Sequence, residues 1–75
     1  MSIIATVDMV ATGCNIERMR KSAGFSVKDL QMIFGFSSPQ AIYKWQRGLT
    51  LPTIDNLVVL SAALNVKIDD IVVIK

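Results

Sequence analysis

Apolar residues recur at helical spacing in the middle of the chain and predict the first of two short helices. The apolar positions that share one helical face are Leu30, Ile33 and Phe34. Ser26 precedes Asp29 by three residues, the spacing at which a side-chain oxygen caps a helix and a carboxylate favours its positive end. The pattern predicts a helix that begins at Val27 and ends at Gly35, a residue that adopts a left-handed turn easily.

A second amphipathic pattern follows that glycine. Ser38 before Pro39 is a start signal, because proline at the first helical position gives up an amide that would have had no partner. Ile42 and Trp45 share one face, which we expect in the core. The other face carries hydrogen-bonding and cationic side chains: Gln40, Tyr43, Lys44 and Arg47. Two short helices joined by a glycine-containing turn are the geometry in which the second can lie in the DNA major groove.

Three further helices are predicted around this pair. A first helix, begun by Thr12 or Asn15 and ended near Gly24, has an apolar side of Ile16, Met19 and Ala23. After Pro52, Thr53 is a plausible cap for a helix ending near Asn65, with an apolar stripe of Leu57, Leu60, Ala63 and Leu64. A short fifth helix is expected where Lys67, a poor cap, precedes two first-turn acids, Asp69 and Asp70.

The two ends of the chain are rich in β-branched residues, which suit strands. These residues are Ile3, Ile4, Thr6 and Val7 at one end and Ile71, Val72, Val73 and Ile74 at the other. Our hypothesis is that the ends pair as a small sheet, within one chain or between two. No repeat, linker or low-complexity run interrupts the sequence, so residues 1–75 are expected to form a single domain.

The stretch from Ser26 to Pro52 resembles the Cro and phage-repressor type of helix-turn-helix, the Xre family. The resemblance covers roughly residues 15–71. It rests on Arg20, Gly24, Leu30, Gly35, Ser37, Ile42, Trp45, Gly48, Pro52, Leu57, Leu60, Leu64, Val66 and Asp69. It implies a mainly all-α, lambda-repressor-like domain of four to five helices with the motif at about 26–48, and a DNA-binding protein.

In the family, the exposed face of the second motif helix, here 39–47, contacts bases. By resemblance, the Gln40 amide could pair bidentately with adenine, and Ala41 could offer a methyl contact to thymine. Lys44 could reach a guanine edge or a phosphate. The other DNA-binding candidates are Ser38 at the helix start and three residues placed near the DNA backbone: Tyr43, Arg47 and Lys28.

Three positions depart from the family pattern. Six residues separate Gly35 from Ile42 where the family has five, so the turn or helix start holds one more. Gln31 stands where the family usually has alanine, and the longer turn could make room for it. Gln46 replaces a glutamate that commonly pairs with the arginine equivalent to Arg20. A neutral hydrogen bond could replace that ion pair with little change in stability. We interpret the three departures as one linked variant.

The charge is unevenly distributed although the net charge is only +2. Residues 14–48 carry six basic residues against two acidic ones, a local +4, whereas residues 49–75 carry two against three, a local −1. This places positive charge where a polyanion-binding face requires it, although charge alone favours ordinary solvated helix faces. The hydrophobic fraction of 52% is high for so short a chain and predicts a self-association face.

Several classes of protein are disfavoured. Histidine is absent and Cys14 is the only cysteine, so no disulfide within the chain, no cysteine-histidine metal cluster and no acid-base or nucleophile constellation is expected. We expect no enzyme activity and no cofactor. Cys14 is interpreted as a small buried or half-buried residue, and Met9, Met19 and Met32 as packing residues. No membrane-spanning stretch or secretory signal is evident, which favours the cytoplasm.

The leading hypothesis is a sequence-specific DNA-binding transcription regulator, a repressor, that reads the major groove of double-stranded DNA with helix 39–47 and acts as a homodimer. The alternative is a protein-interaction module, such as an antitoxin-like or co-regulator subunit, in which the same surface meets a protein and the apolar termini hold the partner. The departures in the turn favour it, and so does an apolar content greater than a small core needs.

Overall fold

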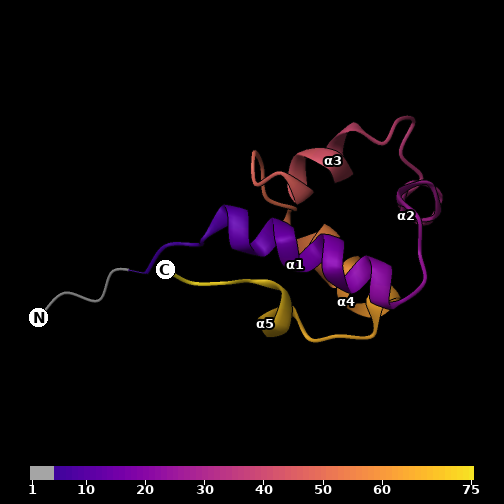
Figure 1. Cartoon of the computed structure of the whole chain (residues 1–75). Helices are drawn as coiled ribbons and strands as arrows, with labels where there is room; N and C mark the ends of the chain where they lie inside the picture. Colours follow the sequence, from indigo (N-terminus) through magenta and orange to yellow (C-terminus); the bar gives the residue numbers. More distant parts are fainter. Residues whose placement is uncertain (1–4) are drawn as a thin grey trace, which may run out of the picture.

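The computed structural model describes residues 5–75, which form five helices without a sheet. These are α1 (Met9–Ser22), α2 (Val27–Phe34), α3 (Gln40–Gln46), α4 (Ile54–Leu64) and α5 (Ile68–Ile71). The long α1 runs through the middle of the molecule, with α3 packed on one side of it and α5 on another (Figure 1). The expectation of a mainly helical helix-turn-helix domain is confirmed.

The capping signals of α2 act as predicted. The Ser26 hydroxyl accepts a hydrogen bond from the Asp29 backbone N–H at 3.0 Å. The Asp29 carboxylate in turn accepts one from the Ser26 N–H at 2.8 Å. At the other end, Gly35 has φ +71°, a left-handed conformation that glycine adopts without a Cβ clash. The bounds of α2 therefore follow from local chemistry.

The predictions for α4 and α5 are also confirmed. The Thr53 hydroxyl accepts from the Asn56 N–H at 3.2 Å, and Asn65 ends α4 in the left-handed region at φ 54°. At α5, the Lys67 side chain gives no cap, but the Lys67 N–H donates to the Asp70 carboxylate at 3.1 Å. The acid three residues into the helix thus stabilises its start.

The predicted start of α1 was wrong, because the helix begins one turn before Thr12. The Asp8 carboxylate caps it by accepting from the Ala11 N–H at 3.0 Å. The Asp8 N–H meanwhile donates to the carbonyl of Val73 at 2.7 Å. The local cap at Asp8 gives α1 an additional turn, and the far end of the chain contacts the same residue through its backbone.

The start of α3 also differs by one residue. The Pro39 carbonyl accepts the first helical hydrogen bond from the Tyr43 N–H at 3.1 Å, so Pro39 precedes the helix and Gln40 is its first residue. Pro39 has ψ 3°, which is not a helical value, and therefore lies outside the first turn.

One face of each helix contributes to a single apolar core. The buried members are Ile16, Met19, Leu30, Ile42, Trp45, Leu57, Leu60, Leu64 and Ile71. The prediction that Ile42 and Trp45 point inward is confirmed, since their side chains are 0% and 4% exposed. Beside them, the Trp45 ring meets the rings of Phe34 and Phe36 edge-on, with centroids 5.4 Å and 5.9 Å away.

Four side chains expected in or near the core are exposed instead: Ile33, Met32, Cys14 and Ala23. In α2 the inward row is Val27, Leu30 and Phe34, so Met32 and Ile33 project away from it. Cys14 lies two residues from Ile16, on the other side of α1. Ala23 follows the last residue of α1. The apolar character of these residues was a poor guide to their burial.

Within residues 5–75, the two ends of the chain meet at one bridge. Val7 pairs antiparallel with Ile74, and the Lys75 N–H donates to the Thr6 carbonyl at 2.9 Å. Among residues 5–75 no sheet forms, because Ile71 belongs to α5 and leaves a short segment to pair. The other predicted strand residues, 3 and 4, lie outside the described residues. For pairing within one chain, the hypothesis is correct at this bridge, and residues 5–75 form no sheet; pairing between two chains stays a prediction.

Candidate nucleic-acid interface

The helix α3 has one buried and one exposed face. Ile42 and Trp45 lie on the buried face, whereas Gln40 and Lys44, one turn apart, are exposed. Tyr43 is 39% exposed. The exposed face therefore presents an amide, a phenol and an ammonium group from a rigidly packed helix.

A shallow hollow of about 360 Å³ lies alongside this face. It is lined by Phe36, Ser37, Ser38, Gln40, Ala41, Lys44 and Thr50. Four of the sequence-predicted residues are thus brought together: Ser38, Gln40, Ala41 and Lys44. Sequence reasoning missed Phe36, Ser37 and Thr50 as neighbours of this group. A signal for Thr50 existed in Gly48, whose φ of +73° turns the chain back over the end of α3.

The other three candidates lie away from the hollow. Arg47 follows α3 and places its guanidinium 6.0 Å from the centroid of the Tyr43 ring, the distance of a weak cation–π contact. Lys28 is exposed on the first turn of α2 and does not line the hollow. These three side chains form the flanks of the candidate interface.

A side-chain hydrogen bond and an aromatic contact stabilise the longer turn between α2 and α3. The Gln31 side-chain amide donates to the Phe36 carbonyl at 3.3 Å. The Phe36 ring stacks on Phe34 with centroids 5.0 Å apart. Gln31 therefore satisfies a carbonyl of the turn, which is consistent with its interpretation as linked to the turn length.

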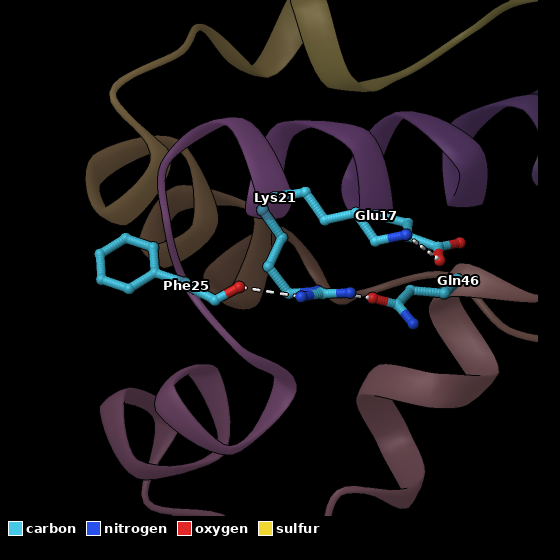
Figure 2. Close-up of polar contacts among 5 residues, drawn as sticks. Glu17, Lys21, Phe25 and Gln46 are labelled. Carbon is cyan, nitrogen blue, oxygen red and sulfur yellow. Dashed lines mark hydrogen bonds and ion pairs between the residues drawn. The ribbon is translucent and has the colours of Figure 1, made fainter.

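The Arg20 side chain of α1 holds the end of α3 through hydrogen bonds to uncharged partners. Its Nε donates to the Gln46 side-chain oxygen at 2.9 Å, and an Nη donates to the Phe25 carbonyl at 2.8 Å. Figure 2 shows Phe25 and Gln46 on opposite sides of this guanidinium, joined to it by dashed lines. The expected hydrogen bond in place of an ion pair is present, and it ties the end of α3 to α1.

Fewer cations are exposed and unpaired than the number of basic residues in the sequence indicates. Arg20 is only 8% exposed, and Lys21 pairs with Glu17 at 3.2 Å. Lys28, Lys44 and Arg47 have no ion-pair partner among residues 5–75. The cations available to a ligand on α2 and α3 are therefore the three that the sequence singled out.

One carboxyl group near the interface has a perturbed pKa. Hydrogen bonds from the Ser26 backbone N–H and then from its side chain hold the pKa of Asp29 below its ordinary value of 3.8. Asp29 thus remains an anion next to Lys28 at neutral pH and serves the helix start.

Residues 5–75 contain no group of three or more cysteine or acidic residues placed to hold a metal ion. None of their helices has the length and apolar character needed to span a membrane.

The capped α2, the glycine turn and the half-buried α3 together define a helix-turn-helix protein. A helix-turn-helix family model matches residues 16–71, so the chain belongs to this family, the Xre or Cro and CI type of DNA-binding transcription regulator.

Comparison with solved structures supports the fold. The restriction-modification controller protein C.AhdI from Aeromonas hydrophila is similar to this chain with a TM-score of 0.75 and 22% sequence identity. The match covers 85% of this chain and 96% of that protein. A comparison with curated protein sequences finds no match.

Proposed function

We propose that this protein is a sequence-specific regulator, a repressor, that inserts α3 into the DNA major groove and acts as a homodimer in the cytoplasm. The observation that carries the proposal is the division of α3 into two faces. Ile42 and Trp45 fix the helix in the core, while Gln40 and Lys44 project outward beside a shallow hollow. A helix held in this way can meet base edges without losing its own packing.

Each exposed side chain has a distinct role in the proposal. Gln40 pairs with an adenine edge, Ala41 contacts a thymine methyl, and Lys44 reaches a guanine or a phosphate. Ser38, Tyr43, Arg47 and Lys28 approach the DNA backbone. A good base contact supplies about 1–3 kcal/mol of discrimination, and phosphate contacts supply salt-dependent affinity.

The dimer is proposed because one α3 of seven residues contacts few bases. Two copies bound about one helical turn of DNA apart, roughly 34–36 Å, would read two half-sites. Exposed apolar side chains at Ile54 and Val58, 73% and 53% exposed, provide surface that self-association could cover.

Selection of binding sites from random DNA tests the proposal, with Gln40→Ala, Lys44→Ala and the control Lys67→Ala measured on the selected site. We expect a two-fold-symmetric consensus in the selected DNA. Gln40→Ala should weaken binding by about 1–3 kcal/mol and relax the preference at one position. If Lys44 contacts a base, Lys44→Ala should likewise weaken binding and relax the preference at one position. If it contacts a phosphate, the variant should lose the salt dependence of the affinity that about one phosphate contact contributes. Full affinity and an unchanged consensus in both variants would show that α3 is not the recognition helix.

A second candidate function is a protein-interaction module, such as an antitoxin-like or co-regulator subunit. The exposure of Met32 and Ile54, 73% each, favours it, because large apolar side chains at the surface often mark protein contacts. No enrichment of any DNA sequence at low salt, together with a stable protein complex purified from cells, would favour this function over DNA recognition.

A further inference from the structure

A glycine lies where α1 packs tightly against the end of α3. Gly13 is buried in the second turn of α1, where alanine would be the better helix former. A Cβ built on Gly13 would lie 2.8 Å from the carbonyl oxygen of Gln46 and closer still to that of Trp45. Both carbonyls belong to the last turn of α3, so the main chain of α3 occupies the space that a side chain at Gly13 would need.

The same end of α3 meets α1 at a second point. Gly48, two residues after α3, lies against the main chain of Val10, where a Cβ would be 2.7 Å from the Val10 Cα. Packing against α1 is thus the main support of α3, which lies next to α1 in Figure 1. Both α1 residues precede residue 16, where the family match begins.

We propose that Gly13 is a positioning residue for DNA recognition, because its missing side chain sets how closely the carbonyl end of α3 seats on α1. This inference rests on α3 being the helix that contacts DNA. A side chain added at position 13 would clash with main-chain carbonyls of α3. Only a movement of the backbone could relieve this clash, because no flexible side chain is in the way. A shift on the order of 1 Å exceeds the roughly 0.5 Å tolerance of a well-positioned binding site. Gln40 and Lys44 would then miss their base edges.

The test compares Gly13→Ala with the control Cys14→Ala, which changes the next residue on the exposed side of α1. The affinity of each protein is measured for the selected DNA site and for unrelated DNA of equal length, at a temperature where circular dichroism shows the protein folded. We expect Gly13→Ala to lose about tenfold or more in the ratio of the two affinities, the scale of one base contact. Binding to unrelated DNA should be unchanged, because it depends on phosphate charge.

Backbone amide chemical shifts provide a readout that needs no DNA. In Gly13→Ala the largest changes away from the substitution should fall on residues 40–48, and Cys14→Ala should leave these amides unchanged. If the wild-type protein selects no DNA, the proposed function fails, while these shifts still report whether Gly13 positions α3.

The Gly13→Ala substitution could unfold the protein, so it is also tested in a variant expected to be more stable. Gly13→Ala is also made together with Gln46→Glu, which introduces a carboxylate beside Arg20, and is compared with Gln46→Glu alone. An affinity ratio within about twofold of the reference would overturn the proposal, since twofold is well below the energy of one base contact. Failure to fold in both backgrounds would also overturn it, because Gly13 would then be a determinant of global stability.

Discussion

Because Arg20 donates a hydrogen bond to the uncharged side chain of Gln46, Gln46→Glu is the most informative single substitution for stability. In the wild type, a guanidinium that is 8% exposed donates to an amide oxygen 2.9 Å away. No carboxylate lies within ion-pair distance of it among residues 5–75. The desolvation cost of Arg20 is therefore already part of the wild-type free energy, and the variant adds only that of the new carboxylate.

The expected magnitude follows from two opposing contributions. Opposite charges about 4 Å apart attract by about 4 kcal/mol at an effective dielectric constant of 20. Desolvation of the carboxylate costs several kcal/mol and offsets most of this. A hydrogen bond to a charged partner contributes about 1.5–3 kcal/mol against about 0.5–1.5 kcal/mol for a neutral one. We therefore expect Gln46→Glu to stabilise the fold by about 1 kcal/mol, which raises the Tm of so small a domain by roughly 4–8 °C.

Thermal and urea unfolding between pH 3 and pH 8 measure this effect. The gain should be present at pH 7 and disappear below about pH 4, where a glutamate side chain takes up a proton. The matched control Gln46→Met keeps the length but removes the acceptor, and should cost about 1–3 kcal/mol by leaving a buried donor of Arg20 unpaired. Destabilisation by Gln46→Glu at pH 7 that is relieved on acidification would refute the reasoning, since desolvation of the carboxylate would then exceed its attraction to Arg20.

Two further predictions concern the chain end and α2. The buried Thr12 hydroxyl accepts from the Val73 N–H at 3.0 Å, so Thr12→Val should cost about 1–3 kcal/mol and speed hydrogen exchange at Val73; unchanged exchange would contradict this contact. The lowered pKa of Asp29 means that its contribution to stability is present above its ordinary pKa of 3.8 and lost as the pH falls through its folded value. The difference in urea midpoint between wild type and Asp29→Ala should therefore shrink on acidification, and a difference constant from pH 6 to pH 2 would argue against it.

Several boundaries could be read from the sequence because the signals are local. Ser26 and Asp29 satisfy each other's backbone within three residues, and Gly35 and Asn65 supply the left-handed ends of α2 and α4. Thr53 caps α4 in the same way. These interactions span a single turn, so the residues that make them are visible in the sequence.

The candidate site could be predicted only in part. The order of side chains along a helix assigns Gln40 and Lys44 to one face and Ile42 to the other, whatever surrounds the helix. The hollow beside them also needs Thr50, which the turn at Gly48 brings to α3. A residue brought in by a turn of the main chain has no fixed periodicity to reveal it.

What the sequence by itself determined is the identity of the helices and the polar face of α3. Asp8 caps α1 through the nearby Ala11 N–H, a local signal, but only the tertiary structure brought the Asp8 backbone N–H to the Val73 carbonyl at the other end of the chain. Only the tertiary structure decided the role of Gly13, whose lack of a side chain matters solely because the carbonyls of α3 lie against it. Both outcomes depend on contacts between residues more than thirty positions apart, and such contacts leave no local pattern.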